Sequence, residues 1–385
     1  MSTLLKNCYL VTPGFEHEDM SVLIENGKIA RIFVHGDKLP AADNVKDCSN
    51  TILMPGFVDV HCHGRSGFDF CDATVEAIAT IAKNKLAEGV TTLLPTTLTV
   101  SEEQLIGTMK SAAEYASGEE YAKGCKIPGV HLEGPYINSK LIGAQNPAFV
   151  RLPDIEEVKR LNAIYPVKKV SYAPEVDGGA VFASELLACG IIPSAVHTAA
   201  THAEFLDAYR HGIRNLSHFC NQMTALHHRD IGMVGAGLLH DDVYIELICD
   251  KLHICPDMIE LVFALKDIKH IQLISDAMRA SGMPDGEYDL GGMQTFVKAG
   301  AARLANGALA GSTLQICDAL KNVCEVTGIA LCELVRTTSD NQAQTLALGK
   351  IGRIEPGYAA DLVLLNDDFK VLSTFVDGEE RYCAK

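Results

Sequence analysis

The chain has 385 residues, of which 48% are hydrophobic and 21% are charged. These proportions are typical of a soluble globular protein with a large core. The 49 acidic residues outnumber the 33 basic ones, and the net charge of -16 repels nucleic acid and anionic lipid. The composition therefore argues against a nucleic-acid or membrane partner, and an anionic substrate would need cations within its own binding site.

Cysteine usage indicates the compartment. The 13 cysteines are an odd number, without any Cys-x-x-Cys pair. They lie in apolar runs such as Leu247–Cys249, where a free thiol packs as a small hydrophobic group. The N-terminus shows no signal-peptide pattern, and no apolar segment is long enough to cross a bilayer. We therefore expect a cytoplasmic protein.

The two ends of the chain share a strand-and-turn character. Residues 4–53 contain short β-like runs, and Asn26-Gly27 between two of them is typical of a type I′ hairpin. Residues 357–365 and 375–378 also resemble strands with turns. We expect both ends to pair in one small β-sandwich domain over residues 1–54 and 345–385.

Between these ends, apolar strand-like runs alternate with amphipathic helical runs. Capping boxes at Ser101–Gln104 and Thr201–Glu204 predict helix starts, and Gly89 and Gly190 are placed as helix C-caps. Such alternation gives parallel strands, and eight units suggest an α/β fold closed into a (β/α)8 TIM-like barrel over residues 55–344. The strands are predicted at Phe57–His61, Val90–Pro95, Ile127–Glu133, Val167–Ala173, Ile191–His197, Arg214–His218, Val243–Cys249 and Ile271–Asp276.

An open, doubly wound sheet is the alternative to a barrel. Neither a Gly-x-Gly-x-x-Gly motif nor a phosphate-binding P-loop follows a first strand, so the sequence does not favour it. After the eighth predicted strand, the glycine-rich residues 281–311 predict a loop and hairpin over the barrel mouth.

Several predicted strands end in potential metal ligands. His61 and His63 end the first strand, and because side chains alternate across a strand they share one face. Glu133 ends the third strand, His197 the fifth and His218 the sixth. Reacting groups of such barrels lie at strand C-termini, so we predict that these five side chains meet around a divalent cation. Surface or hydrogen-bonded core histidines are the alternative.

The ligand types limit the metal. Nitrogen and oxygen ligands without thiolate suit Zn²⁺, Fe²⁺, Mn²⁺ or Co²⁺, with zinc the default for hydrolysis. Glu133 has two oxygens and could bridge two ions, one bound by His61 and His63 and the other by His197 and His218. One or two ions per chain both remain open. His131 shares a face with Glu133 and is predicted to support the ligands rather than to bind directly.

Asp276, at the end of the eighth predicted strand, is the candidate general base and acid. A bound cation lowers the pKa of its water toward ~7 and supplies hydroxide as the nucleophile. A nearby carboxylate can take the proton during attack and return it to a leaving amine. An N-cap role for Asp276 is the alternative. His253 could face the substrate, and Arg229 is a candidate phosphate clamp.

These motifs resemble those of known enzymes. Residues 55–64 (PGFVDVHCHG) and 357–363 (GYAADLV) resemble the amidohydrolase superfamily. Residues 131–136 (HLEGPY), 215–223 (NLSHFCNQM) and 226–229 (LHHR) are more specific and resemble the N-acetylglucosamine-6-phosphate deacetylase family. The resemblance runs over essentially the whole chain. It implies metal-dependent hydrolysis of N-acetylglucosamine 6-phosphate to glucosamine 6-phosphate and acetate.

The resemblance also implies roles for individual residues. Glu133, His197 and His218 match the principal metal ligands, and His61 and His63 match a pair present only in members able to hold a second ion. Asp276 matches the catalytic acid and base. The implied contacts to the small-molecule amino sugar phosphate are Ala144, Gln145, Asn221, Gln222, Arg229, His253, Leu309, Ala310 and Gly311. Because Arg229 in family members tends to reach the neighbouring subunit's site, a homodimer is implied.

The chain departs from the family pattern beside the substrate. Gln222 stands where the family usually has alanine, so the identity of the sugar stays open, and N-acetylgalactosamine 6-phosphate is an alternative substrate. A cyclic-amide hydrolase would commonly carry a bridging lysine at the end of the fourth strand, but Lys168 and Lys169 are expected to precede that strand. A sugar-phosphate binder without catalytic activity is disfavoured by the intact acid and base.

Overall fold

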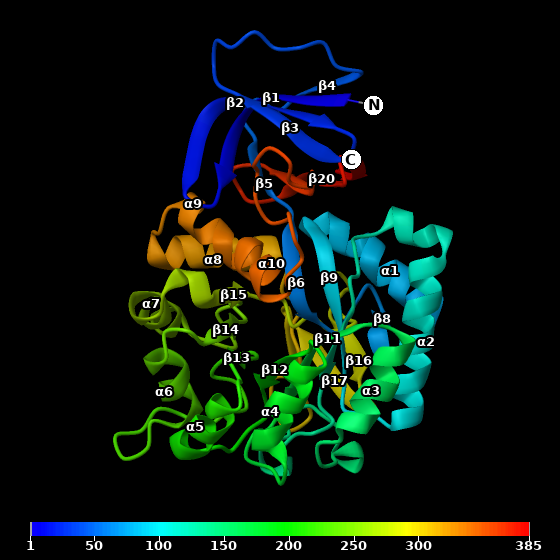
Figure 1. Ribbon diagram of the computed structural model, residues 1–385, viewed down its shortest axis with the longest axis vertical. Coiled ribbons are helices and arrows are strands. Elements are labelled where there is room, and N and C mark those ends of the chain that lie inside the picture. Colours follow the sequence, from blue (N-terminus) through cyan, green and yellow to red (C-terminus); the bar gives the residue numbers. More distant parts are fainter. Residues whose placement is uncertain (1, 385) are drawn as a thin grey trace.

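The computed structural model of the protein describes residues 2–384. A small β structure that carries both chain ends lies against one end of a larger body of strands surrounded by helices (Figure 1). Among the described residues, no helix is both long enough and apolar enough to cross a membrane.

Both ends of the chain contribute to one eight-stranded sheet of the described residues. Strand β5 lies at the join, since it pairs in parallel with β1 and antiparallel with β19. Asn26 and Gly27 have φ angles of 51° and 75°, which confirms the predicted hairpin turn between β2 and β3. The strands are β1 (Ser2–Thr12), β2 (Phe15–Glu25), β3 (Lys28–Phe33), β4 (Asn44–Asp47), β5 (Ile52–Pro55), β19 (Leu362–Leu365), β20 (Val371–Val376) and β21 (Glu379–Cys383).

The second large sheet is the predicted barrel. Its neighbouring strands pair in parallel, in chain order. A parallel bridge between Cys62 and Ala277 joins the end of the eighth strand to the first, and the Asp276 amide donates to the His61 carbonyl at 2.8 Å. The strands are β6 (Phe57–Cys62), β9 (Val90–Thr97), β10 (Val130–Glu133), β11 (Val167–Tyr172), β12 (Ile192–Ala195), β13 (Asn215–Leu216), β14 (Tyr244–Leu247) and β15 (Ile271–Leu273).

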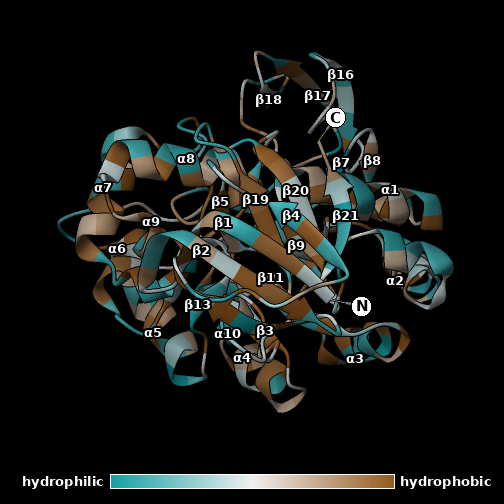
Figure 2. Cartoon of the chain, turned by 90° about the horizontal axis from the view of Figure 1, so that it is seen from above, coloured by the Kyte–Doolittle hydropathy of each residue, from teal (hydrophilic) through white to brown (hydrophobic). Residues whose placement is uncertain are grey.

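Helices follow the strands and cover the outside of the barrel (Figure 1). Figure 2 shows hydrophobic strands such as β9 and β11 inside, and helices with mixed hydrophilic and hydrophobic faces around them. The helices are α1 (Val75–Lys85), α2 (Glu102–Ser117), α3 (Ile155–Ile164), α4 (Gly179–Ala188), α5 (His202–Arg210), α6 (Gly232–Leu239), α7 (Pro256–Leu265), α8 (Ile316–Thr327), α9 (Leu331–Leu334) and α10 (Asp340–Thr345).

The predicted helix ends are confirmed with one exception. Thr201 and Glu204 form the full capping box at the start of α5. Ser101 accepts from the Gln104 amide, but the Gln104 side chain donates to the Cys71 carbonyl, so the reciprocal half of that box is absent. Gly89 and Gly190 have φ angles of 81° and 71°, as C-capping glycines require.

The segment after the eighth strand forms more structure than the predicted loop and hairpin. It contains a three-stranded antiparallel sheet of β16 (Gly286–Leu290), β17 (Met293–Lys298) and β18 (Ala301–Leu304). Figure 2 shows this sheet projecting from the body beside the short strands β7 (Gly64–Arg65) and β8 (Phe68–Asp69). Leu290 at the end of β16 lines the cavity described below, together with Leu309.

Candidate metal centre and active site

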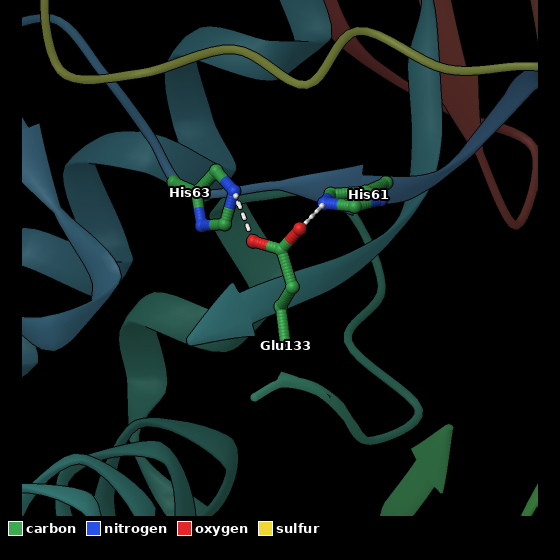
Figure 3. Close-up of side chains that lie close together, drawn as sticks. All are labelled: His61, His63 and Glu133. Atoms are coloured by element: carbon green, nitrogen blue, oxygen red, sulfur yellow. Dashed lines mark ion pairs between the residues drawn. The ribbon is translucent and has the colours of Figure 1, made fainter. Parts of the chain in front are cut away.

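Glu133, the last residue of β10, lies at the centre of the site. His61 and His63 point toward it from the end of β6 (Figure 3). The His63 Nε2 atom is 3.2 Å from Glu133 Oε2, and the His61 Nε2 atom is 3.6 Å from Glu133 Oε1. His197 and His218 approach the same Oε1 atom with their Nε2 atoms, at 3.5 and 3.0 Å. Five side chains that lie far apart in the sequence therefore converge on one carboxylate.

These side chains form two overlapping groups. One contains His61, His63 and Glu133, and the other contains Glu133, His197 and His218. Within each group the candidate ligand atoms lie within 4.8 Å of one another, and all five residues are buried. Glu133 belongs to both groups: its Oε2 atom faces His63, and its Oε1 atom faces His61, His197 and His218.

Asp276 lies beside the first group. Its Oδ1 atom is 3.1 Å from His63 Nε2 and 3.5 Å from His61 Nε2. It is 7% exposed and lines the same cavity, so it borders the position where a substrate would meet the ligands.

Three of these functional residues have an unusual backbone conformation. His197, His218 and Asp276 have φ angles of 43°, 31° and 48°, in the left-handed region that non-glycine residues seldom adopt. Consequently β12, β13 and β15 end two or three residues before these positions, and the prediction that the strands extend through them is wrong. Each such conformation costs on the order of 1–3 kcal/mol, and all three residues line the cavity described below.

The ring nitrogens of the four histidines fit metal binding. Each Nδ1 atom faces a group that only accepts hydrogen bonds, so Nδ1 must donate: His61 to Glu246 at 3.0 Å, His63 to the Thr96 carbonyl at 3.2 Å, His197 to the Leu141 carbonyl at 2.8 Å, and His218 to the Asn221 carbonyl at 3.1 Å. In the neutral ring, every Nε2 then offers a lone pair toward the Glu133 carboxylate. A divalent cation would replace any proton on Nε2 and bind these lone pairs together with the carboxylate oxygens, so the donor set fits a metal ion.

The charges around this centre shift its pKa values. Burial lowers the pKa of His61, but Glu133 and Asp276 outweigh it and raise that pKa to about 9. Burial raises the pKa of Glu133, yet the histidines around it hold the value well below the usual range. For Asp276, burial is likewise outweighed by His61 and His63, which lower the pKa. Both carboxyl groups are therefore ionised at neutral pH, and the centre attracts positive charge.

Most of the predicted substrate contacts line one cavity of about 210 Å³ at the barrel mouth. This volume suits part of a small molecule rather than a polymer. The predicted residues that line it are His63, Glu133, Ala144, Gln145, His197, His218, Asn221, Gln222, His253, Asp276, Leu309 and Gly311.

Three predicted residues do not line that cavity. His61 is fully buried beneath it, and Ala310 is fully buried, with its amide donating to the Ala302 carbonyl at 3.1 Å. Arg229 lies on an exposed loop, where its guanidinium contacts His228 Nε2 at 2.9 Å. The structure therefore does not bring Arg229 into the cavity of its own chain.

Other contacts hold the ligands in place. Gln145 donates to Glu133 Oε2 at 2.6 Å and accepts from the Thr99 amide at 2.7 Å, so it positions the central carboxylate. His131 contacts Ser171 Oγ at 2.6 Å, and its ring packs edge-on against His61 at 4.6 Å. His131 thus lies beside the ligands without joining either group, as the sequence predicts.

Sequence reasoning missed a buried ion pair inside the barrel. Lys169 contacts Glu246, whose other carboxylate oxygen accepts from His61. The expectation that Lys168 and Lys169 precede the fourth strand is wrong, since both lie within β11. The available signal was the presence of Lys169 and Glu246 within two predicted barrel strands, because charged residues are buried only with a partner.

Gly143 lies close to two cavity residues. A Cβ atom there would be 3.0 Å from both His197 Cε1 and Gln222 Cγ, and its φ of 58° disfavours other residues. The absence of a side chain lets the loop before Ala144 lie directly against the ligand His197.

The chain matches a known family over most of its length. The model of the amidohydrolase family matches residues 52–381. The chain belongs to the amidohydrolase family. Among curated relatives, this amidohydrolase is 35% identical to N-acetylglucosamine-6-phosphate deacetylase of Lysinibacillus sphaericus, covering 99% of the chain and 98% of the relative. It is 33% identical to N-acetylgalactosamine-6-phosphate deacetylase of Escherichia coli O157:H7, covering 98% and 99%.

Solved structures agree with this membership. The amidohydrolase superposes on N-acetylglucosamine-6-phosphate deacetylase from Thermotoga maritima with a TM-score of 0.89 and 36% identity, covering 99% of this chain and 100% of the other. A variant of the Mycobacterium smegmatis enzyme, solved in complex with N-acetyl-D-glucosamine-6-phosphate, gives a TM-score of 0.92 at 28% identity, with 99% of both chains covered. The fold predicted from the sequence is thereby confirmed.

Proposed function

We propose that this amidohydrolase is a metal-dependent deacetylase of N-acetylglucosamine 6-phosphate, releasing glucosamine 6-phosphate and acetate. The observation that carries the proposal is the convergence of four histidines on Glu133, with Asp276 beside them at the mouth of a small cavity. The full-length relatives named for this reaction support the choice of substrate.

Glu133, His197 and His218 would hold one divalent cation, and His61, His63 and Glu133 a second. Neutral imidazole and carboxylate ligands favour zinc, while iron, manganese and cobalt suit the same ligand set. When bound, such a cation polarises the acetamide carbonyl and lowers the pKa of a water molecule at the site.

Asp276 would move the proton. Its pKa is held low, so the group is a carboxylate at neutral pH and can accept a proton from the attacking water. The resulting carboxylic acid then donates that proton to the amine nitrogen as the C–N bond breaks. The backbone strain at Asp276 fixes the direction from which this carboxylate reaches the cavity.

The remaining cavity residues would bind the sugar. His253 Nδ1 donates to Asp250 Oδ2 at 2.7 Å, which leaves its Nε2 atom available to a substrate oxygen. Three loops supply the other predicted sugar contacts, namely Ala144 and Gln145, Asn221 and Gln222, and Leu309 and Gly311, with the buried Ala310 holding the third loop in place. Because the whole chain has a net charge of -16, binding the substrate's phosphate requires a positively charged side chain beside it.

We propose that this cation is Arg229 of the partner subunit in a homodimer. The loop that carries Arg229 is exposed, and Leu226 on it is 57% exposed. An apolar hollow lined by Leu226, Met258 and Leu261 also includes His253, so it adjoins the cavity. Mixing two inactive variants, Arg229→Ala and Asp276→Asn, tests this arrangement, because one active site of each mixed dimer would contain both native residues and regain activity. A monomer in sedimentation experiments contradicts it.

Acetate release from N-acetylglucosamine 6-phosphate tests the function directly. The unmodified chain should release acetate, whereas Asp276→Asn should retain its metal and lose turnover by about 10²–10⁴-fold, the typical contribution of a general acid and base. Near-normal turnover of that variant, or no acetate release by the metal-loaded unmodified chain, contradicts the proposal.

N-acetylgalactosamine 6-phosphate is the second candidate substrate. Gln222 lines the cavity, and a full-length relative named for that substrate is nearly as similar as those named for the glucosamine compound. A comparison of kcat/KM for the two sugars, in the unmodified chain and in Gln222→Ala, decides between them. A preference for the galactosamine compound that Gln222→Ala reverses would favour this candidate.

We also propose a division into a small β domain, residues 1–54 and 345–385, and a barrel domain, residues 55–344. A separate hydrophobic core supports it, since its buried members, such as Leu10, Ile24 and Leu364, all come from the two end segments. For the compartment we propose the cytoplasm, because the 13 cysteines of the chain are all free.

A further inference from the structure

The interior of the barrel contains an ion pair that has no role in the proposed reaction. Lys169 on β11 and Glu246 on β14 are 3% and 2% exposed. The Lys169 ammonium contacts Glu246 Oε1, and Glu246 Oε2 accepts from His61 Nδ1 at 3.0 Å. A buried lysine, a buried glutamate and a ligand histidine therefore form a continuous chain of hydrogen bonds that ends at the metal centre.

Stability alone does not account for this pair. Removing two charges from water costs several kcal/mol per ion, and well-packed hydrophobic residues in their place are often neutral or stabilising. Because side chains alternate across a strand, the adjacent buried residues Val170, Ile245 and Leu247 face the surrounding helices, whereas Lys169 and Glu246 face the barrel interior and His61.

The partner of His61 differs from those of the other ligand histidines. His63, His197 and His218 donate from Nδ1 to backbone carbonyls, whereas His61 donates to a carboxylate. The buried His61 Nε2 atom has no hydrogen-bond partner among residues 2–384, and it lies 3.6 Å from Glu133 Oε1. A carboxylate on one ring nitrogen fixes the ring and makes the other nitrogen a stronger metal ligand.

We propose that Lys169 and Glu246 are positioning residues that set the affinity of the His61–His63–Glu133 site for its ion, and thereby decide whether the chain holds one ion or two. Lys169 binds one oxygen of Glu246 and leaves the other for His61. In the second group, His197 and His218 donate to backbone carbonyls instead of to this pair, so the ion of that group should bind independently of Lys169 and Glu246. This inference rests on the proposed metal-dependent function, and it assigns the pair a role in occupancy rather than in catalysis.

Zinc titration of the metal-stripped, full-length chain tests the inference. In Glu246→Gln, zinc should bind about 10–100-fold more weakly to one of two sites, as is typical when a partner of a ligand histidine is lost. The other site should keep its affinity. Glu157→Gln is the matched control, because Glu157 is also buried and paired with one basic residue, Arg151, but lies on α3. It should keep both affinities.

A second variant guards against misfolding. Lys169→Met leaves a buried carboxylate unpaired, but Lys169→Met combined with Glu246→Gln removes both charges and should fold. Its circular dichroism should match that of the unmodified chain, while cobalt loading should give the absorption of one high-affinity ion instead of two. Two ions bound with unchanged affinity in this folded variant overturn the inference, as does a single ion in the unmodified chain.

The outcome is separable from that of the deacetylase assay. If the zinc affinities split as expected but no acetate is released, the proposed function fails while the role of the pair stands. If acetate is released and both variants bind two ions normally, the function stands and the role of the pair fails.

Discussion

Replacing Lys85 with methionine should destabilise the barrel strongly. The Lys85 side chain is fully buried and contacts Asp59 Oδ2 at 3.0 Å, Glu88 Oε2 at 2.9 Å and Ser275 Oγ at 3.2 Å. Asp59 lies on β6, Glu88 follows α1 and Ser275 follows β15, at the point where the barrel closes. Glu88 keeps Arg65 as a partner when the lysine is removed, but Asp59 loses its only cation among the described residues.

The size of the effect follows from the burial of Asp59. Breaking a buried ion pair by removing one member costs about 3–5 kcal/mol, because the other charge stays buried and unpaired. With an unfolding entropy of about 2.1 cal/mol/K per residue, a chain of 385 residues loses about 4–6 °C in melting temperature. Since Asp59 also accepts from Ser275 Oγ at 2.6 Å, next to Asp276, turnover should fall as well.

Calorimetry of Lys85→Met measures the loss, with Lys159→Met as the control. Lys159 also pairs with a glutamate three residues away, but its side chain is 50% exposed, so its replacement should leave the melting temperature almost unchanged. The combined change of Asp59→Leu and Lys85→Met should recover most of the stability. A loss for Lys85→Met as small as that of the control would refute the reasoning.

Three further results are expected. Chelation of the resident cations should lower the melting temperature without abolishing the fold, since a ligand present at 1,000 times its Kd contributes about 4 kcal/mol; scanning calorimetry before and after reloading checks this. Gly143→Ala should raise KM, because its Cβ would lie 3.0 Å from His197 and Gln222; an unchanged KM contradicts the close approach. Burial raises the pKa of Asp69 from 3.8 to about 6. Protonated Asp69 therefore adds its full share to the free energy of unfolding below pH 3.8, and this share is lost as the pH rises through about 6. Asp69→Asn should therefore stabilise the chain at pH 8 by up to about 3 kcal/mol and do little at pH 4, as urea unfolding at both values would show.

The sequence predicts the order of the strands because the apolar runs and the helix signals are local. It also predicts that ligands gather at one end, since parallel strands in a closed barrel present their C-termini together. The convergence of His61, Glu133 and His218 could therefore be predicted without any knowledge of side-chain packing.

Other features depend on contacts that local sequence does not encode. The strands end before His197, His218 and Asp276 because the site holds these residues in left-handed conformations. Lys169 and Glu246 lie 77 residues apart in the sequence, and the residues around each of them do not indicate which residue it pairs with. Gln104 was predicted to complete a capping box, but the nearby Cys71 carbonyl competes for its side chain.

The position of β5 has a consequence for synthesis of the chain. Its two neighbours, β1 and β19, come from opposite ends of the sequence. Until the ribosome has released the last few dozen residues, one edge of Ile52–Pro55 has no strand to pair with, and exposed strand edges promote aggregation. Nascent or C-terminally truncated chains should therefore need chaperone protection at this edge, even when every barrel strand is already present.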